Sequence, residues 1–271
     1  MSDSAPAFQA VSLTIADGIA QLTLNRPATL NALNTEMFHE IPQAVEQASL
    51  AGARVLLITG AGRGFCSGAD LVGRSFATPT GEAQRIAANR AGFEKVITLV
   101  RAINEAPMPV VCAINGVAAG GGVGIALSGD VILMAESARF VLTFVPKLGL
   151  VPDVAATWLM SRMAGRARVM AASLLGEPIS SRQAENWGLV ARVIADAELQ
   201  AEAMAICRRL ADGPQAAVAS TRRLVDAAPE MPLGAHILLE RDMQAPLIGS
   251  PEHKEGIAAF REKRPARFAA S

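Results

Sequence analysis

The chain has 271 residues, and its 25 basic and 25 acidic side chains give a net charge of zero, which gives no support for nucleic acid as the main partner. Three scattered histidines offer no metal-ligand spacing, so we expect no metal site, and three cysteines without a C-x-x-C pair favour reduced thiols in the cytoplasm. No apolar run reaches the ~18 residues of a membrane span, and the polar N-terminus is unlike a signal peptide.

The predicted elements alternate between strands and helices up to about residue 195 and are helical after it. Strands are expected at 11–15, 19–24, 54–60, 110–114, 130–135, 138–142 and 190–194. Helices are expected at 34–51, 86–104, 123–127, 153–163, 166–175, 180–189, 195–210, 214–227 and 232–243. The segment 72–84 is expected to be mobile, and 143–153 to be a loop. We therefore predict an α/β core over residues 1–195 and a helical region over 196–271.

The apolar strand at 110–114 leads to three consecutive glycines at 120–122 and then to a small-residue helix. A glycine run at a helix N-terminus presents backbone N–H groups and a partial positive charge. Nucleotide-binding patterns do not fit, because no G-x-x-x-x-G-K-[ST] is present and the G-x-G-x-x-G spacing fails at Ile125. The alternatives are an oxyanion that appears only during reaction and a packing site without chemistry.

A second glycine-rich loop, residues 60–71, supplies the second N–H donor that an oxyanion hole needs. We expect this loop to end in Ala69-Asp70-Leu71 and to turn into a helix, with Asp70 either a cap or first-turn carboxylate of that helix or a binding residue. Cys66 lies in the same loop, but no histidine is close to it in sequence. A packed thiol is therefore favoured over a nucleophile.

Four motifs, in this order, resemble the crotonase family of enoyl-CoA hydratases and isomerases over roughly residues 10–268. They are R-P-x-x-x-N-A-L at 26–33, G-x-G-F-x-S-G-A-D-L at 62–71, N-G-x-A-x-G-G-G at 115–122 and G-L-V-P-D at 149–153. The resemblance implies a spiral of ββα units with a helical C-terminal region that trimerises. It also implies an acyl-CoA substrate, no separate cofactor, and a homotrimer or a dimer of trimers.

The same resemblance assigns roles to individual residues. The N–H groups of Ala69 and Gly121 are expected to form the oxyanion hole for the thioester oxygen, and the adenine end of CoA is expected near Arg26. The expected substrate-binding residues are Arg26, Leu30, Ala32, Gly68, Ala69, Asp70, Leu71, Gly121, Phe144, Phe260 and Lys263. Around Phe260 and Lys263, a solvated basic tail is the alternative to a CoA-phosphate site.

The acids expected beside the acyl chain indicate which reaction occurs. Hydratases of the family carry one carboxylate just after the glycine run and another ahead of G-L-x-P, where this chain has Gly124 and either Phe144 or Val145. Isomerases use one carboxylate directly after that proline, which here is Asp153. Because one base suffices for a 1,3-proton shift, we expect Asp153 to be the single acid/base of an acyl-CoA isomerase. Its alternative role is to cap the following helix.

The stretch 143–158 most resembles the isomerase branch that includes epoxyphenylacetyl-CoA isomerase, which leaves fatty-acid and aromatic-acid degradation both open. A hydratase is the alternative function, and it needs a second acid such as Glu136. A non-catalytic acyl-CoA-binding or RNA-binding relative is a remote third possibility. Neutral charge disfavours RNA, and the retained Asp153 disfavours lost chemistry.

Overall fold

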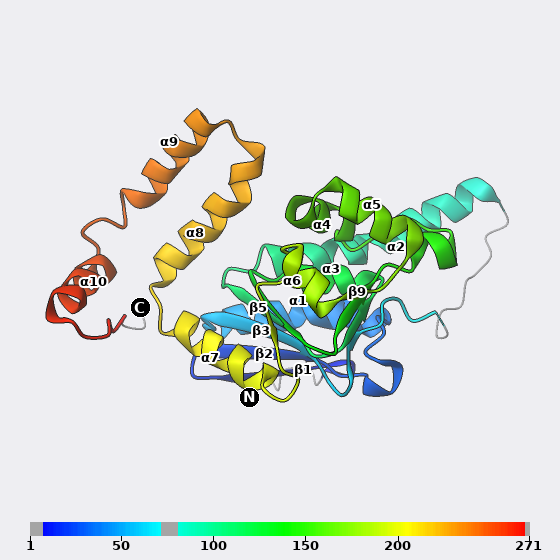
Figure 1. Cartoon of the computed structure of the whole chain (residues 1–271), viewed down its shortest axis with the longest axis horizontal. Coiled ribbons are helices and arrows are strands. Elements are labelled where there is room, and N and C mark those ends of the chain that lie inside the picture. The colour runs from blue at the N-terminus through cyan, green and yellow to red at the C-terminus, as the bar shows by residue number, and fades with distance from the viewer. Residues whose placement is uncertain (1–7, 72–80, 269–271) are drawn as a thin grey trace, which may run out of the picture.

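The computed structural model describes residues 8–71 and 81–268, which form two β-sheets, surrounding helices and a projecting C-terminal arm (Figure 1). The larger sheet has the strand order β1 (Val11–Ala16), β2 (Ile19–Leu24), β3 (Val55–Gly60), β5 (Val110–Ile114), β7 (Val131–Ala135) and β10 (Arg192–Ile194). The smaller sheet has the order β4 (Gly64–Cys66), β6 (Val117–Ala119), β8 (Arg139–Val141) and β9 (Ile179–Ser180).

The helices fill the connections between strands and the whole of the C-terminal part. Along the chain they are η1 (Pro27–Thr29), α1 (Thr35–Leu50), α2 (Glu82–Asn104), α3 (Gly121–Leu127), η2 (Phe144–Leu148), α4 (Ala156–Ala164), α5 (Arg166–Leu175), α6 (Ser181–Asn186), α7 (Leu199–Ala211), α8 (Gln215–Ala227), η3 (Ala228–Glu230), α9 (Leu233–Gln244) and α10 (Pro251–Glu262). No described helix is both long and apolar enough to cross a lipid bilayer.

The chain advances as a spiral in which successive turns add one strand to each sheet. β3 continues into β4, β5 into β6 and β7 into β8, while β3–β5–β7 and β4–β6–β8 pair in parallel. The antiparallel pairs are β1–β2, joined at Asp17-Gly18, and β8–β9. This arrangement confirms the predicted crotonase-type α/β fold. Because the strands are parallel, their C-terminal ends and the loops that follow them lie at the same edge of the sheet.

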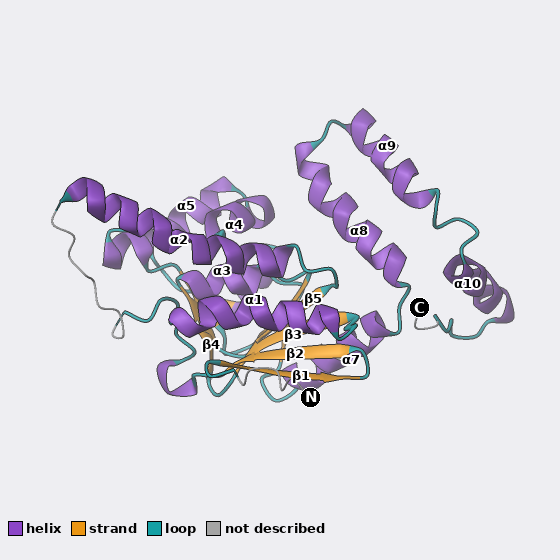
Figure 2. Ribbon diagram, turned by 180° about the vertical axis from the view of Figure 1, so that it is seen from behind, coloured by secondary structure: helices purple, strands orange, loops and turns teal. Residues whose placement is uncertain are grey.

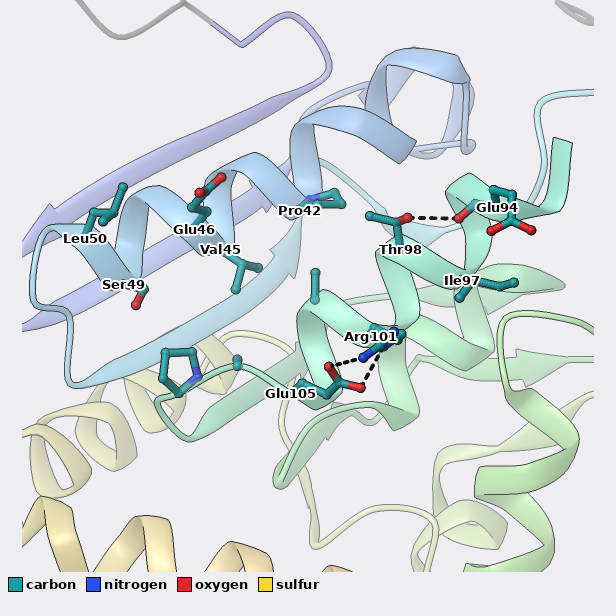
Figure 3. A pocket seen from close by; sticks show the side chains of 13 residues that line it. Pro42, Val45, Glu46, Ser49, Leu50, Glu94, Ile97, Thr98, Arg101 and Glu105 are labelled. Atoms are coloured by element: carbon teal, nitrogen blue, oxygen red, sulfur yellow. Dashed lines mark hydrogen bonds and ion pairs between the residues drawn. The ribbon is translucent and has the colours of Figure 1, made fainter. Parts of the chain in front are cut away.

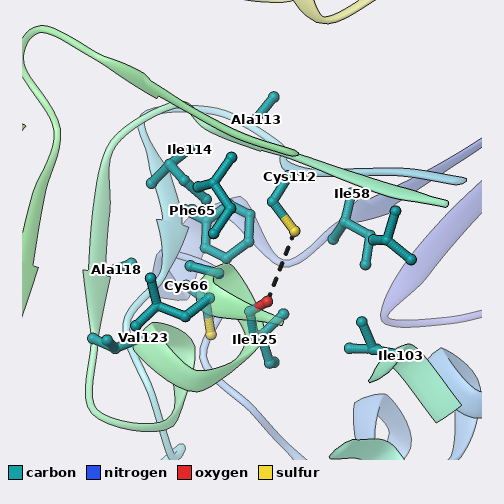
Figure 4. Close-up of a cluster of buried hydrophobic side chains, with 14 of the residues drawn as sticks. Ile58, Phe65, Cys66, Ile103, Cys112, Ala113, Ile114, Ala118, Val123 and Ile125 are labelled. Carbon is teal, nitrogen blue, oxygen red and sulfur yellow. Dashed lines mark hydrogen bonds between the residues drawn. The ribbon is translucent and has the colours of Figure 1, made fainter. Parts of the chain in front are cut away.

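Helices cover both faces of the larger sheet. Figures 1 and 2 view the molecule from opposite sides, with α7 in front of the sheet in one view and α1 in front in the other. Strands covered on both faces must be continuously apolar, and β3 and β5 are buried along their whole lengths. Figure 4 shows α3 in this core, where the thiol of Cys112 lies 3.8 Å from the carbonyl oxygen of Ile125.

The helices α8, α9 and α10 form an arm that projects from the body (Figures 1 and 2). Arg222 on α8 connects this arm to the sheet. Its guanidinium lies 2.9 Å from the Asp130 carboxylate and donates to the carbonyl oxygens of Ala106 and Met108. Neither α8 nor α9 buries a residue.

Several predicted boundaries were wrong near the glycine-rich loops. Ala69 pairs in a parallel bridge with Leu33, and Asp70 and Leu71 are not helical, while the segment after Leu71 lies outside the described residues. The short strands β4, β6 and β9 were not predicted, because segments of two or three residues carry no readable alternation. The predicted loop 143–153 contains the π-helical turn η2, and the helix expected from Asp153 begins at Ala156. Residues 72–80 of the segment expected to be mobile lie outside the described residues.

Candidate active site

The two glycine-rich loops come into direct contact at Gly68. A Cβ atom on Gly68 would lie 2.7 Å from the carbonyl oxygen of Ala119 and 3.3 Å from the Cα of Gly120, so no larger residue fits there. Gly68 also has a φ of 88°, in the region that favours glycine. The two predicted sources of N–H donors therefore border one site, although they are more than 50 residues apart in the sequence.

The backbone of Ala69 is oriented by its bridge to Leu33. The N–H of Leu33 donates to the Gly68 carbonyl oxygen at 2.7 Å, and the N–H of Asp70 donates to the Leu33 carbonyl oxygen at 3.0 Å. In such a parallel bridge the middle residue turns its own N–H to the opposite side. The N–H of Ala69 consequently points away from Leu33, as a donor to a ligand must.

A buried asparagine joins segment 26–33 to the first part of this loop. Asn31 is fully buried, and its side-chain amide donates to the carbonyl oxygens of Ala61 and Gly64 at 3.0 and 2.8 Å. Its side-chain oxygen accepts the N–H of Arg26 at 2.8 Å. Asn31 has a φ of 56°, and asparagine tolerates this left-handed conformation better than most residues. The sequence motif contained Asn31, but its role as a connector was not predicted.

Arg26 and Asp70 form an ion pair across the same loops. The guanidinium of Arg26 lies 2.9 Å from the Asp70 carboxylate and also donates to the Ala32 carbonyl oxygen at 2.6 Å. Both side chains are largely buried, with exposures of 23% and 13%. Asp70 is therefore a partner of Arg26, and the residues 72–80 that a cap at Asp70 would serve lie outside the described part of the chain. Arg26, expected near adenine, here connects segment 26–33 to the loop that carries Ala69.

Gly121 is the first residue of α3, and Gly120 precedes it with a φ of 53°. The first N–H groups of a helix have no acceptor within the helix, and the helix dipole adds partial positive charge there. A Cβ on Gly120 would lie 3.7 Å from the ring of Phe144, which is 5% exposed. Phe144 thus covers the start of α3 and is placed where it can border an acyl chain.

Asp153 lies beside this helix start. Its carboxylate oxygen Oδ1 lies 3.5 Å from the position that a Cβ on Gly121 would occupy, and the residue is half-buried. The N-cap of α4 is Ala155 and not Asp153. Val154 and Ala155, with φ values of 51° and 57°, separate the acid from the helix. Non-glycine residues held there cost about 1–3 kcal/mol each and cluster at functional sites. No local pattern in the sequence predicted this backbone conformation.

The two positions at which hydratases of the family carry their acids are unsuited to acids here. A Cβ on Gly124 would overlap the carbonyl oxygen of Val154, so a larger side chain has no room without movement of the backbone. The second position falls in the turn η2, on Phe144 or Val145, neither of which transfers protons. Glu136, the other acid considered for hydration, pairs with Arg182 at 2.8 Å and is 54% exposed.

The remaining predicted binding residues lie at different distances from the site. Leu30 and Ala32 belong to the segment held by Asn31, and Leu71 is 49% exposed at the end of the described loop. Phe260, 86% exposed, and Lys263 lie on or just after α10, at the far end of the arm in Figures 1 and 2. In this chain they are not brought to the site. Their neighbour Arg264 pairs with Glu255, which lowers the pKa of that carboxyl to about 2.

Cys66 packs beneath both loops. Burial raises the pKa of its thiol to about 12, partly opposed by a hydrogen bond from the Gly68 backbone. The thiol is therefore protonated at neutral pH, which agrees with a packed residue and not a nucleophile. Within residues 8–71 and 81–268, no three His, Cys, Asp or Glu side chains are grouped so that they can hold a metal ion.

A groove of about 570 Å³ lies elsewhere, between α1 and α2 (Figure 3). Pro42, Val45 and Leu50 line one wall, while Ile97 and the paired Arg101 and Glu105 line the other. None of the predicted site residues lines it.

Comparison with known proteins gives a consistent result. The family profile described as enoyl-CoA hydratase/isomerase matches residues 14–271. A 1,2-epoxyphenylacetyl-CoA isomerase of Escherichia coli K12 is 42% identical over 93% of this chain and 95% of its own. A "probable enoyl-CoA hydratase" of Rhodobacter capsulatus is 37% identical over 96% and 98%. The crystal structure of an enoyl-CoA hydratase from Bacillus anthracis superposes with a TM-score of 0.87 at 29% identity, covering 97% and 100%.

Proposed function

The chain is an enzyme of the enoyl-CoA hydratase/isomerase family, also called the crotonase family, and we propose that it is an acyl-CoA isomerase that moves a double bond. Its substrate is a 3-enoyl-CoA or a related ring acyl-CoA, and its product is the conjugated 2-enoyl-CoA or the corresponding ring isomer. One observation carries the proposal. Asp153 lies beside the start of α3, while the position of a second acid at Gly124 is closed.

The proposed reaction is a proton transfer between two carbons of the substrate. The N–H groups of Ala69 and Gly121 donate to the thioester oxygen, and Asp153 removes a proton from C2. The electrons move through the conjugated system onto the thioester oxygen, which gives a dienolate. Asp153 then returns the proton to C4, so that no atom is gained or lost. One such N–H donor typically contributes ~3 kcal/mol to stabilisation of the developing charge.

The apolar surroundings of Asp153 support this assignment. Phe144 on η2 is buried against the start of α3, which Asp153 also borders, and Val154 next to Asp153 is 4% exposed. A site of this kind excludes water, which competes for the proton between the two transfer steps. Hydration has the opposite requirement, because a bound water must be activated by a base to attack one carbon while an acid donates a proton to the other.

The C-terminal arm carries apolar surface that indicates an assembly of several subunits. Several apolar side chains on the arm are exposed, including Val225, Leu233, Ile248 and Phe260, with exposures of 62–86%. Apolar surface of this extent is typical of contacts with a partner. We infer that the arm, within the predicted helical region 196–271, mediates a homotrimer or a dimer of trimers. Free thiols at Cys66, Cys112 and Cys207 favour a reducing compartment such as the cytoplasm.

A paired assay on the purified protein tests the proposal. In the first assay, a straight-chain or ring-bearing 3-enoyl-CoA is the substrate, and the appearance of the conjugated thioester is measured. In the second, a 2-enoyl-CoA is the substrate, and loss of its conjugation by addition of water is measured. We expect isomerisation without appreciable hydration. Hydration at an equal or greater rate contradicts the proposal and favours the hydratase activity named for some relatives.

The variant Asp153→Asn tests the acid directly. We expect kcat for isomerisation to fall about 10²–10⁴-fold, the usual contribution of a general base, with KM within a few-fold. Asp17→Asn, in the exposed β1–β2 turn, is the matched control and keeps full activity. Near wild-type turnover by folded Asp153→Asn protein contradicts the assignment.

A further inference from the structure

The side of α3 that faces Asp153 carries two glycines, Gly121 and Gly124. Residues three apart lie on the same face of a helix, so these glycines leave a notch in the helix surface, here called the glycine notch. The backbone and side chain of Val154 fill it. Val154 Cγ2 lies 2.8 Å from the Cβ position of Gly121, and its own Cβ lies 2.9 Å from that of Gly124.

The segment that enters the notch is a tight turn in an unfavourable conformation. The N–H of Ala156 donates to the Asp153 carbonyl oxygen at 3.0 Å, and both residues between them have positive φ. Turns of this kind normally use asparagine and glycine at the two central positions, and a β-branched residue there is an outlier. Such a conformation persists only where surrounding structure determines it, and here contact with the glycine notch supplies that constraint.

We propose that the Val154 turn, seated in the glycine notch, is the positioning device for the Asp153 carboxylate and that Gly124 thereby determines the reaction. This inference rests on the proposed isomerase function. Val154 occupies the volume in which a second carboxylate on α3 would stand. The same contact carries the Asp153 carboxylate to the first residue of α3. The same packing of Val154 against α3 thus excludes an acid at residue 124 and positions the carboxylate of Asp153.

Gly124 does more than leave α3 without a second acid. Since the Val154 carbonyl oxygen lies within the space of a Cβ, even alanine at residue 124 has to displace the turn. A displacement of about 1 Å at a reacting group costs on the order of 10²-fold in rate. A glutamate at residue 124 displaces the turn as well, so it removes isomerisation without creating a hydratase.

The experiment measures kcat, KM and the thermal midpoint of Gly124→Ala on the full-length protein. We expect kcat for isomerisation to fall about 10²-fold, with KM within about two-fold of wild type. The matched control is Gly92→Ala on α2, where an added Cβ meets nothing within 4 Å and activity is unchanged. A folded Gly124→Ala protein with wild-type kcat overturns the inference.

Two further variants keep the test decisive. If Gly124→Ala does not fold, Val154→Gly decides, because glycine adopts the left-handed turn readily but removes the side chain from the notch. We expect its kcat to fall about ten-fold with KM kept, and an unchanged kcat overturns the inference. Gly124→Glu is assayed for hydration, and any gain above the wild-type rate also overturns it.

Failure of the proposed function is distinguishable from failure of this inference. If wild-type protein does not isomerise 3-enoyl-CoA, the proposed function is wrong whatever the variants do. If wild-type protein isomerises but its kcat is insensitive to Gly124→Ala, the function stands and the positioning role is wrong. Loss of kcat together with a proportional rise in KM indicates general damage to binding and also contradicts a specific role in aiming Asp153.

Discussion

The two walls of the candidate oxyanion hole are built by different physical means. Ala69 is held by polar side chains, since Asn31 connects segment 26–33 to the loop 60–71 and Arg26 pairs with Asp70. Gly121 is held by close contact between backbones at glycines, with Val154 in the space where side chains would be. A single polar contact can be removed while the others remain, whereas any side chain added in the glycine notch displaces the whole Val154 turn. We therefore expect graded losses at the first wall and abrupt losses at the second.

The largest effect expected at the first wall comes from removing its donor. Ala69→Pro deletes the N–H without adding a large side chain, and we expect kcat to fall about 10²–10³-fold. Ala69→Gly keeps the N–H and serves as the control with near wild-type kcat. Steady-state kinetics with unfolding midpoints measure both. Full turnover by folded Ala69→Pro protein shows that this N–H does not stabilise the transition state.

The connector at this wall comes next. Asn31→Ala leaves the carbonyl oxygens of Ala61 and Gly64 and the N–H of Arg26 without their buried partner. We expect the free energy of unfolding to drop by about 3 kcal/mol, as measured by urea denaturation. Asn25→Ala, on an exposed residue nearby, changes it by less than about 0.5 kcal/mol. A drop no larger than that of the control means that the two segments are held by other contacts.

Cys66 lies where the two walls meet, since its backbone contacts Gly122 and its thiol accepts the Gly68 N–H. Its pKa of about 12 in the folded chain exceeds the ordinary value near 8.5. The resulting stability is complete below about pH 8.5 and is lost as pH rises toward 12, by about 1.4 kcal/mol per unit. Between pH 8 and pH 10, Cys66→Ala protein should lose about 2 kcal/mol less than wild type in urea unfolding.

No tyrosine is present to titrate in the same range. Cys112 and Cys207, whose thiols also have raised pKa values because they are buried, contribute equally to both proteins and cancel in the comparison. If the free energy of unfolding of wild-type and Cys66→Ala protein changes identically with pH, the prediction is contradicted. It shows that the Cys66 thiol is ionised as easily in the folded chain as in the unfolded one.

The smallest effect is expected from the ion pair. Arg26→Met removes the contacts to Asp70 and to the Ala32 carbonyl oxygen, and we expect a loss of about 1 kcal/mol and a few-fold fall in kcat. Arg101→Met, on an exposed pair of α2, is the matched control without effect on kcat. A loss of CoA-thioester affinity without a loss of stability supports the expectation that the adenine end of CoA lies near Arg26.

The sequence alone determined the fold class and the two glycine-rich loops. Apolar strands at 55–60 and 110–114 and the motif glycines are local signals, and parallel strands bring the loops after them together. It also determined that Asp153 is retained and that Gly124 is not an acid. These are statements about residue type and order, which one chain reports directly.

Only the tertiary structure decided how the acid is aimed and how the loops are held. The short strand β4 and the bridge of Leu33 to Ala69 depend on partners distant in sequence. Asn31 acquires its role only when the loop 60–71 folds against segment 26–33. The positive φ of Val154 opposes its local preference. The physical reason is that close packing against Gly121 and Gly124 outweighs a local preference of a few kcal/mol, and no local pattern in the sequence encodes that contact.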